Sequence, residues 1–225
     1  MSVLKLDGIE VRDYQKNIAE TASQKNTLVV LPTGMGKTLI SVLIAAKRLE
    51  QFPEKKILVM APTRPLNAQH KKTFEKFIDI KSEQIALVTG KILPAERSEI
   101  YNQSRIIVAT PQTIENDLRN ERLSLEDFCF ITFDEAHRAV KNYAYPFIAK
   151  KYMLQSKNPL ILALTASPGA TSERINETCR NLFIRAVEIR TEHDLDVEKY
   201  VKPIEREFVY VDFPEEFKKT KNLLN

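Results

Sequence analysis

The sequence is poor in the residues that build disulfide frameworks and metal cages. Its 225 residues include only two cysteines and three histidines. The isolated histidines His70, His137 and His193 form no zinc-binding spacing. Cys129 lies in an apolar run, where a buried free thiol is expected. These absences argue against a disulfide-stabilised secreted domain and a structural zinc domain, and we expect a reducing cytoplasmic location.

Two further features are absent, namely a membrane-length apolar run and a long basic arm. No run approaches the ~18 apolar residues of a membrane helix, and the first residues lack the apolar segment of a signal peptide. We therefore expect no membrane partner. The net charge is only +4, from 34 basic and 30 acidic side chains. Because phosphate contacts need local Lys and Arg rather than a large total, this balance permits nucleic-acid binding without requiring it.

Short, continuous apolar runs recur along the chain and alternate with amphipathic stretches. The runs cover residues 27–31, 57–61, 85–88, 105–109, 128–133 and 160–164. Continuous rather than alternating apolar runs are typical of strands covered by helices on both faces. The amphipathic stretches cover residues 37–49, 65–77, 94–101, 111–118 and 172–182, and several begin with proline, which suits a first helical turn. This alternation predicts an α/β fold with a doubly wound, mostly parallel sheet and helices on both faces.

The domain organisation follows from the length and from the last segments. A chain of 225 residues is long for one domain and short for two. Residues 205–212 alternate like a strand, and residues 214–224 look helical. We expect residues 1–212 to form one domain and residues 213–225 to begin a helical connection to a further domain.

The strongest candidate site is a glycine-containing loop at residues 31–38. It follows an apolar strand and precedes an amphipathic helix, the context of a phosphate-binding loop. Gly34 and Gly36 would let the backbone approach phosphate oxygens closely, and Lys37 would reach the β- and γ-phosphates. Thr38 would ligate Mg²⁺. Leu31 stands where the general pattern has glycine, so the loop is the variant P-T-G-x-G-K-T; the alternative is a glycine turn that merely starts a helix.

A pair of acids, Asp134 and Glu135, follows the apolar run at residues 128–133. A strand ending there would place the Asp134 carboxylate at the carboxyl edge of the sheet, where open α/β sheets bind ligands. We expect Asp134 to hold Mg²⁺, usually through water, and Glu135 to orient and deprotonate the attacking water. The alternative is a solvated acidic turn after a core strand. Thr132 interrupts the apolar strand without an obvious consequence.

Taken together, these motifs resemble those of the superfamily-two DEAH-box helicases. Residues 32–38 resemble motif I, residues 134–137 (DEAH) motif II and residues 165–167 (TAS) motif III. Residues 12–15 resemble the adenine site, residues 61–66 motif Ia, and residues 89–90 and 109–113 motifs Ib and Ic. Residues 109–118, 134–140 and 142–149 are similar to the archaeal Hef helicase/nuclease and Fanconi anaemia group M family.

The resemblance implies a first RecA-like P-loop NTPase domain that uses ATP and Mg²⁺, and it implies roles for matching residues. The ATP-binding group would be Gln15, Pro32, Thr33, Gly34, Met35, Gly36, Lys37 and Thr38, with Lys37, Asp134 and Glu135 catalytic and Thr38 and Asp134 at the metal. Nucleic-acid backbone contacts would come from Thr63, Arg64, Thr89, Gly90, Thr110 and Gln112, whose alternative is a role in strand-end turns. His137, Thr165 and Ser167 would couple the state of the bound ATP to nucleic-acid binding, although a lone histidine is often structural.

Motifs IV to VI do not follow Ser167, so the sequence carries half of such an active site. The resemblance implies a partner in a second RecA-like domain of the same polypeptide and an ATP-driven motor that acts on branched or forked DNA. An RNA helicase or sensor, and a nucleic-acid-binding module that ATP merely switches, are the alternatives, because backbone contacts do not distinguish DNA from RNA. Glu135 favours the enzyme, since a pure switch needs no water-activating acid.

Overall fold

The computed structural model describes residues 3–6, 8, 10–167, 172–200 and 214, and the structural statements below concern this part of the chain. Its strands are β1 (Thr27–Val30), β2 (Lys56–Met60), β3 (Ile85–Val88), β4 (Ile106–Ala109), β5 (Phe128–Phe133), β6 (Ile161–Thr165) and β7 (Ala186–Ile189). Its α-helices are α1 (Asp13–Ala22), α2 (Lys37–Gln51), α3 (Arg64–Phe77), α4 (Pro94–Gln103), α5 (Pro111–Arg119), α6 (Ala144–Gln155), α7 (Ser172–Asn181) and α8 (Leu195–Glu198). Short 3-10 turns cover Ser82–Gln84 and Ala136–Arg138.

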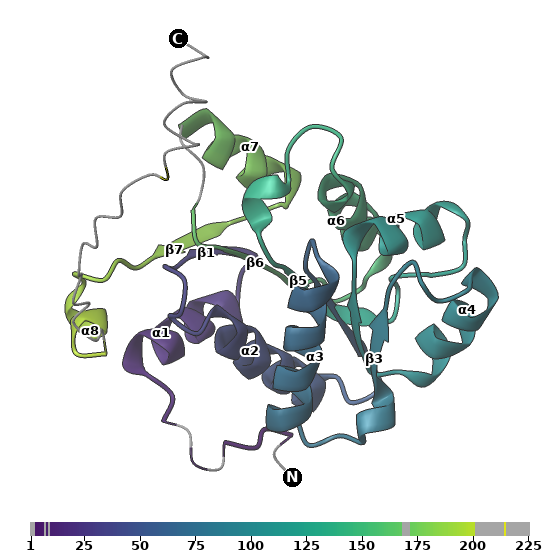
Figure 1. The fold of residues 1–225 in the computed structure, drawn as a ribbon, viewed down its shortest axis with the longest axis horizontal. Helices are drawn as coiled ribbons and strands as arrows, with labels where there is room; N and C mark the ends of the chain where they lie inside the picture. Colours follow the sequence, from purple (N-terminus) through teal and green to yellow (C-terminus); the bar gives the residue numbers. More distant parts are fainter. Residues whose placement is uncertain (1–2, 7, 9, 168–171, 201–213, 215–225) are drawn as a thin grey trace.

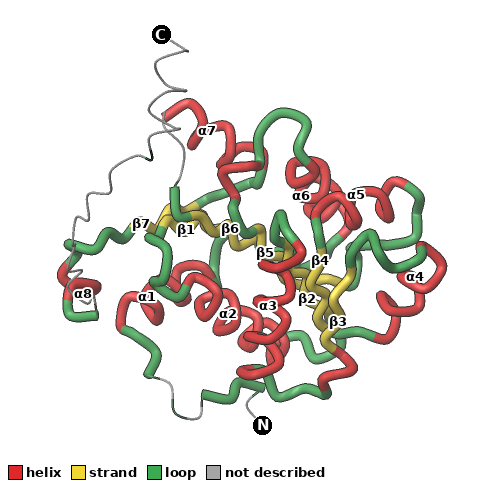
Figure 2. Tube along the Cα trace, in the orientation of Figure 1, coloured by secondary structure: helices red, strands yellow, loops and turns green. Residues whose placement is uncertain are grey.

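The strands form one sheet in the order β3-β4-β2-β5-β6-β1-β7, and each neighbouring pair is parallel. Figure 1 shows α1, α2 and α3 on one face of this sheet and α5, α6 and α7 on the other. Figure 2 shows the strands as a continuous central layer between the helices. The predicted doubly wound parallel sheet is therefore confirmed.

Two apolar cores fill the two faces of the sheet. Side chains of α1, α2 and α3 pack on one face around Phe74 and Phe130. Side chains of α4 to α7 pack on the other face around Phe133 and Tyr145. Because these four rings are all fully buried, each contributes roughly 1.5–3 kcal/mol of hydrophobic stabilisation. The continuous apolar runs in the sequence arise because both faces of each central strand are covered.

All six apolar runs correspond to strands, and the five amphipathic stretches correspond to helices, with small differences at their ends. The sequence pattern did not predict α1, α6, α8 or the edge strand β7. The strand predicted at residues 205–212, the helix predicted at residues 214–224 apart from Pro214, and the boundary at residues 212–213 lie outside the described residues. Among the described helices, none is both long and apolar enough to cross a bilayer.

The strand order sorts the predicted functional loops into two groups along the carboxyl edge of the sheet. The loops after the adjacent strands β5, β6 and β1, with the start of α2, carry the predicted catalytic and coupling residues and all the predicted ATP-binding residues except Gln15, which lies in α1. The loops after the adjacent strands β2, β4 and β3 carry the predicted nucleic-acid residues. Met60 pairs with both Phe133 and Ala109, so β2, β5 and β4 end at one level and both groups share one edge.

Candidate active site

The loop between β1 and α2 is bent by two left-handed glycines. Gly34 has φ +83° and Gly36 has φ +73°, a region that residues with a Cβ rarely adopt. Gly36 is also the N-cap of the 15-residue helix α2, and no side chain caps the first amides of this helix. An uncapped helix N-terminus presents N–H donors and a partial positive charge, so the loop suits an anion such as phosphate.

Lys37 lies between this loop and the acid pair. Its Nζ donates to the carbonyls of Leu31, at 2.8 Å, and Pro32, at 3.1 Å. Burial lowers the pKa of Lys37, while the charges of Asp134 and Glu135 oppose this shift. The lysine on α2 and the two acids after β5 are therefore close enough to interact electrostatically, so both loops lie in the same part of the sheet edge.

The acid pair occupies a fixed turn at the end of β5. The Asp134 N–H donates to Met60 O at 2.8 Å, and the buried Tyr145 hydroxyl donates to Asp134 O at 2.6 Å. The Glu135 N–H donates to Asp134 Oδ1 at 2.9 Å. Glu135 has φ +52°, a left-handed conformation that costs roughly 1–3 kcal/mol for a residue with a side chain. Such strain often occurs at functional positions, where the surrounding structure holds it.

The three predicted coupling residues form a continuous chain of contacts with Glu135. His137 Nδ1 lies 3.3 Å from Glu135 Oε2 and 3.0 Å from Thr165 Oγ1. The Thr165 hydroxyl donates to Ser167 O at 2.7 Å. Leu31 N donates to Thr165 O at 3.1 Å, so the end of β6 also contacts the start of the phosphate loop. His137 is therefore placed to link Glu135, the predicted catalytic acid, with the loop after β6.

Gln15 lies behind the loop rather than out in solvent. Its side chain is buried, with Nε2 donating to Met35 O at 3.3 Å and Oε1 accepting from Arg12 N at 3.0 Å. Tyr14 also donates its hydroxyl to Met35 O, at 2.8 Å. Through its bond to Met35 O, Gln15 therefore supports the backbone of the loop at residues 31–38. Its predicted bond to adenine stays a prediction.

The predicted nucleic-acid residues lie at the ends of β2, β3 and β4. Thr63 and Arg64 are exposed, and the Thr63 hydroxyl caps α3 by accepting from Leu66 N at 3.4 Å. Thr89 is buried, whereas the adjacent Gly90 is exposed. The hydroxyl groups of Thr110 and Thr113 lie 2.8 Å apart, and Gln112 is exposed. The turn roles and the nucleic-acid roles of these threonines are therefore compatible, and their contacts with nucleic acid stay predictions.

Sequence reasoning did not predict the buried polar contacts of His70 and Arg97. His70 Nε2 bonds Asp134 Oδ2 at 2.8 Å, and Arg97 forms a buried ion pair with Asp117 at 2.7 Å. The spacing of Asn67, His70 and Phe74 places these three residues on one face of α3. A polar pair in line with a buried phenylalanine was the signal that could have identified His70. The Arg97–Asp117 pair joins two separate helices and left no such local signal.

Asp134 and Thr38 carry oxygen donors that suit a magnesium–nucleotide complex. A carboxylate of Asp134 and the hydroxyl of Thr38 are the hard oxygen ligands that Mg²⁺ prefers. Among the described residues, no group of three or more His, Cys, Asp or Glu side chains could hold a metal by itself. Mg²⁺ in nucleotide-binding proteins is usually held by one or two carboxylates together with substrate phosphates and water.

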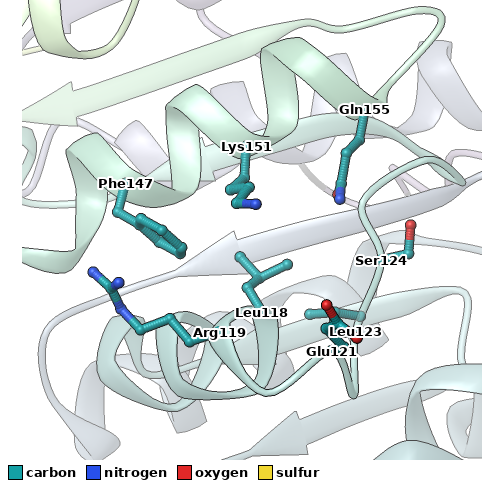
Figure 3. Close-up of a pocket in the computed structure, with 8 residues that line it drawn as sticks. All are labelled: Leu118, Arg119, Glu121, Leu123, Ser124, Phe147, Lys151 and Gln155. Carbon is teal, nitrogen blue, oxygen red and sulfur yellow. The ribbon is translucent and has the colours of Figure 1, made fainter.

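A separate groove lies between α5 and α6, as Figure 3 shows. Phe147 and Lys151 of α6 face Leu118 and Arg119 of α5 across it. The Arg119 guanidinium stacks on the Phe147 ring at 4.0 Å and pairs with Glu115 at 2.7 Å. These charges are already engaged, and the groove holds neither the phosphate loop nor the acid pair. The candidate active site is therefore the sheet edge.

The chain resembles a solved helicase structure over almost its whole length. The crystal structure of the Pyrococcus furiosus Hef helicase domain matches with a TM-score of 0.89 and 50% sequence identity. The match covers 99% of this chain and 47% of that chain. This likeness confirms the RecA-like fold and the expected resemblance to Hef.

Several curated proteins are similar in sequence. A Methanocaldococcus jannaschii protein, provisionally named an ATP-dependent RNA helicase, is 41% identical over 99% of this chain and 28% of its own length. The ATP-dependent DNA helicase fml1 of Schizosaccharomyces pombe is 38% identical over 92% of this chain and 25% of its own length. The Drosophila melanogaster DEAD-box ATP-dependent DNA helicase Fancm is 36% identical over 87% of this chain and 13% of its own length. The chain thus spans less than a third of the length of each of these relatives.

A family assignment also covers most of the chain. Residues 8–170 match the family described as type III restriction enzyme, res subunit. This stretch includes the phosphate loop, the acid pair and the loop after β6, which are the elements that form the candidate site. The chain therefore belongs to the family of the type III restriction enzyme res subunit, and it is a helicase domain of that family that resembles Hef and the Fancm-like helicases.

Proposed function

We propose that the chain is the first motor domain of an ATP-dependent DNA helicase or translocase. The observation that carries this proposal is the interaction of Lys37 with Asp134 and Glu135 beside the uncapped N-terminus of α2. A cation, two acids and free amide donors at one sheet edge are the groups that nucleoside triphosphate hydrolysis needs. The loops after β2, β4 and β3 would hold the nucleic-acid backbone on the other half of this edge.

The residues of the phosphate loop would divide the binding of ATP between them. The amides at the start of α2 would hold the phosphate oxygens, with Gly34 and Gly36 allowing close approach. Lys37 would exchange its bonds to Leu31 O and Pro32 O for bonds to the β- and γ-phosphates. The loop is the Walker A element of this proposal, and residues 134–137 are its DEAH box.

The acid pair would act on the metal and on the attacking water. Thr38 and Asp134 would hold Mg²⁺, which when bound supplies positive charge against the phosphate oxygens. Glu135 would orient a water molecule and accept its proton at the carboxylate as the water oxygen attacks the γ-phosphorus. The bond from the γ-phosphorus to the bridging oxygen would break, and ADP would leave with that oxygen. The side chain of Glu135 is about one-third exposed, so a water molecule can reach it.

A complete active site would require a second motor domain of the same polypeptide. In phosphoryl transfer an arginine finger is worth about 10³–10⁵ in rate. Residues 168–225 carry no sequence motif that would supply one. The greater length of the relatives supports this proposal. We expect the isolated chain to bind ATP weakly and to hydrolyse it slowly. We also propose that the protein works in the reducing cytoplasm.

DNA is the proposed nucleic acid because relatives such as fml1 and Fancm are named DNA helicases. The preference for branched or forked DNA rests on the resemblance to the Hef and Fanconi anaemia group M family. An RNA helicase is the second candidate, because the Methanocaldococcus jannaschii relative carries that name. Contacts to the phosphate backbone alone do not decide between them.

The proposal is tested by measuring ATP hydrolysis by the full-length protein with forked DNA, duplex DNA and RNA. We expect forked DNA to stimulate hydrolysis most. Glu135→Gln should leave nucleotide binding intact and reduce hydrolysis about 10²–10⁴-fold, because it removes the general base. Glu54→Gln, in the exposed loop before β2 at the opposite edge, is the control. Hydrolysis unaffected by Glu135→Gln would overturn the catalytic role, and stimulation by RNA alone would favour the second candidate.

Nucleotide binding is tested separately by titration with a fluorescent ATP analogue. Lys37→Ala should abolish measurable binding, because it removes the cation that faces the phosphates. Lys47→Ala removes an exposed lysine from the same helix and should bind like the unmodified protein. Equal affinity of the two variants would refute the phosphate-loop assignment.

A further inference from the structure

A buried histidine outside the predicted motifs contacts the predicted metal ligand. His70 lies in α3 and is only 3% exposed. Its Nε2 lies 2.8 Å from Asp134 Oδ2 across 64 residues of sequence. Because the carboxylate accepts, the Nε2 atom carries the proton that it donates.

The two oxygens of Asp134 are thereby held by different donors. Oδ1 accepts from Glu135 N at 2.9 Å, and Oδ2 accepts from His70. Donors on both oxygens fix the rotation of the carboxylate as well as its position. A water molecule or metal facing the carboxylate would then meet oxygens of defined direction.

The second ring nitrogen of His70 bears on why an imidazole, rather than an apolar side chain, is buried at this position. Among the described residues, His70 Nδ1 is buried and has no hydrogen-bond partner. A buried unpaired nitrogen is unfavourable for folding, so an apolar side chain would suit stability better at this position. The bond to Asp134 is the polar contact that the structure gives to this imidazole.

The helix that carries His70 begins at the predicted nucleic-acid residues. Thr63 is its N-cap, and Arg64 is its first residue. Asn67, one turn before His70, bonds Ala61 N at 3.0 Å, Ala61 O at 2.7 Å and Thr63 O at 2.9 Å. One face of α3 therefore holds the loop after β2 through Asn67 and the acid after β5 through His70.

We propose that His70 is a positioning residue that holds the Asp134 carboxylate in the orientation needed for Mg²⁺ and ties it to the helix of the nucleic-acid loop. The inference rests on the proposed function, because it gives Asp134 its metal role. Partners that orient metal ligands typically change metal affinity 10–100-fold when they are removed. In this proposal His70 acts through Asp134 rather than on the nucleotide.

The test measures the Mg²⁺ concentration that half-saturates the binding of a fluorescent ATP analogue to the full-length protein. Binding without Mg²⁺ serves as the reference. His70→Leu should raise the half-saturating Mg²⁺ concentration about tenfold and leave the Mg²⁺-free affinity unchanged. His193→Leu replaces an exposed histidine and should change neither quantity.

Two polar variants keep the test decisive if His70→Leu does not fold. The amide of Gln reaches about as far as the histidine Nε2, whereas the amide of Asn reaches only as far as Nδ1. We expect His70→Gln to stay within twofold of the unmodified protein and His70→Asn to require about tenfold more Mg²⁺. Thermal unfolding of all variants separates this pattern from a general loss of structure.

The outcomes distinguish the inference from the proposed function. If the Mg²⁺ requirement of His70→Leu and His70→Asn equals that of the unmodified protein, the positioning role is overturned. If both variants also weaken Mg²⁺-free binding by the same factor, His70 is merely structural and the inference is wrong. If the unmodified protein binds the analogue without any dependence on Mg²⁺, the metal role of Asp134 fails instead.

Discussion

His137 Nδ1 lies 3.0 Å from Thr165 Oγ1 and 3.3 Å from Glu135 Oε2. The Thr165 hydroxyl gives its proton to Ser167 O at 2.7 Å, and the Glu135 carboxylate can only accept. Both neighbours are therefore acceptors, and Nδ1 is the nitrogen of His137 that carries a proton. The same Nδ1–H group therefore lies within reach of both Glu135, the proposed general base, and Thr165 at the end of β6.

Thr165→Val should weaken the coupling between hydrolysis and movement without affecting nucleotide binding. Valine keeps the shape of threonine but cannot accept from His137 or donate to Ser167. We expect the number of base pairs unwound per ATP to fall ~2–30-fold, the range of coupling changes of about 0.5–2 kcal/mol. The measurement compares unwinding and ATPase rates of the full-length protein on the same forked DNA.

Thr178→Val is a matched control for this prediction. Thr178 is also a buried threonine, but among the described residues its hydroxyl has no hydrogen-bond partner. Its replacement should leave unwinding per ATP unchanged. An equal effect of the two variants would show that loss of Thr165 acts through packing rather than through the His137 bond.

Gly36→Ala should destabilise the chain more than Gly34→Ala. Both glycines have positive φ, so alanine at either position costs about 1–2 kcal/mol of backbone strain. A Cβ at Gly36 would also overlap the Gln15 amide, whereas a Cβ at Gly34 meets no atom within 4 Å. The overlapped Nε2 atom is the end of a flexible side chain, so Gln15 can move aside at the expense of its bond to Met35 O. Urea unfolding should therefore show a decrease in stability for Gly36→Ala that is larger by about 0.5–1.5 kcal/mol.

The contact with Gln15 is isolated by a double-mutant cycle. In a Gln15→Ala background the overlap is absent, and Gly36→Ala should cost no more than Gly34→Ala. If the excess cost persists without the Gln15 side chain, the strain comes from the backbone alone.

The sheet and the phosphate loop could be predicted from sequence because their signals are local. Each central strand is a continuous apolar run, and the loop lies directly between such a run and an amphipathic helix. Strand β7 escaped prediction because its alternate residues are exposed, including Ile189 at 53%, and it includes Glu188, so no continuous apolar run marks it.

Pairings between distant segments could not be predicted in the same way. Thr132 seemed to interrupt β5 without consequence, yet its hydroxyl bonds that of Ser41 in α2 at 2.7 Å across 91 residues of sequence. The contact of His70 with Asp134 likewise depends on the order of strands β2 and β5 in the sheet. A single sequence therefore indicates which helices and strands form, but it indicates less well which of them become neighbours in the fold.

Asp117→Asn should be strongly destabilising at neutral pH. Asp117 is fully buried and accepts from Arg97 Nε at 2.7 Å, Arg97 Nη2 at 2.8 Å and the Tyr101 hydroxyl at 2.6 Å. Removing one partner of a buried ion pair leaves the other charge uncompensated, at a cost of about 3–5 kcal/mol. Glu115→Gln, which affects the more exposed pair with Arg119 on the same helix, should change the free energy of unfolding by less than ~1 kcal/mol.

The effect of Asp117→Asn should depend on pH. Burial raises the pKa of Asp117, but hydrogen bonds from Arg97 and Tyr101 outweigh burial and hold the pKa below its ordinary value of 3.8. A lowered folded-state pKa stabilises the fold above pH 3.8, and this contribution disappears as the pH falls through the folded-state value. Urea unfolding of both proteins should therefore give a difference that is constant near neutrality and shrinks below pH 3.8. A difference that grows on acidification would contradict the ionised pair.

Arg64→Ala should reduce both the affinity for single-stranded DNA and its dependence on salt. Arg64 is exposed at the start of α3, where a guanidinium can reach a phosphate. Removing one cation that binds a phosphate should lower the slope of log affinity against log salt by ~0.7 for a single strand. Fluorescence anisotropy of a labelled oligonucleotide at several salt concentrations measures this slope. Lys25→Ala removes an exposed cation that precedes β1, at the opposite edge of the parallel sheet, and should leave the slope unchanged. Equal slopes for the two variants would mean that the nucleic acid does not reach the loop after β2.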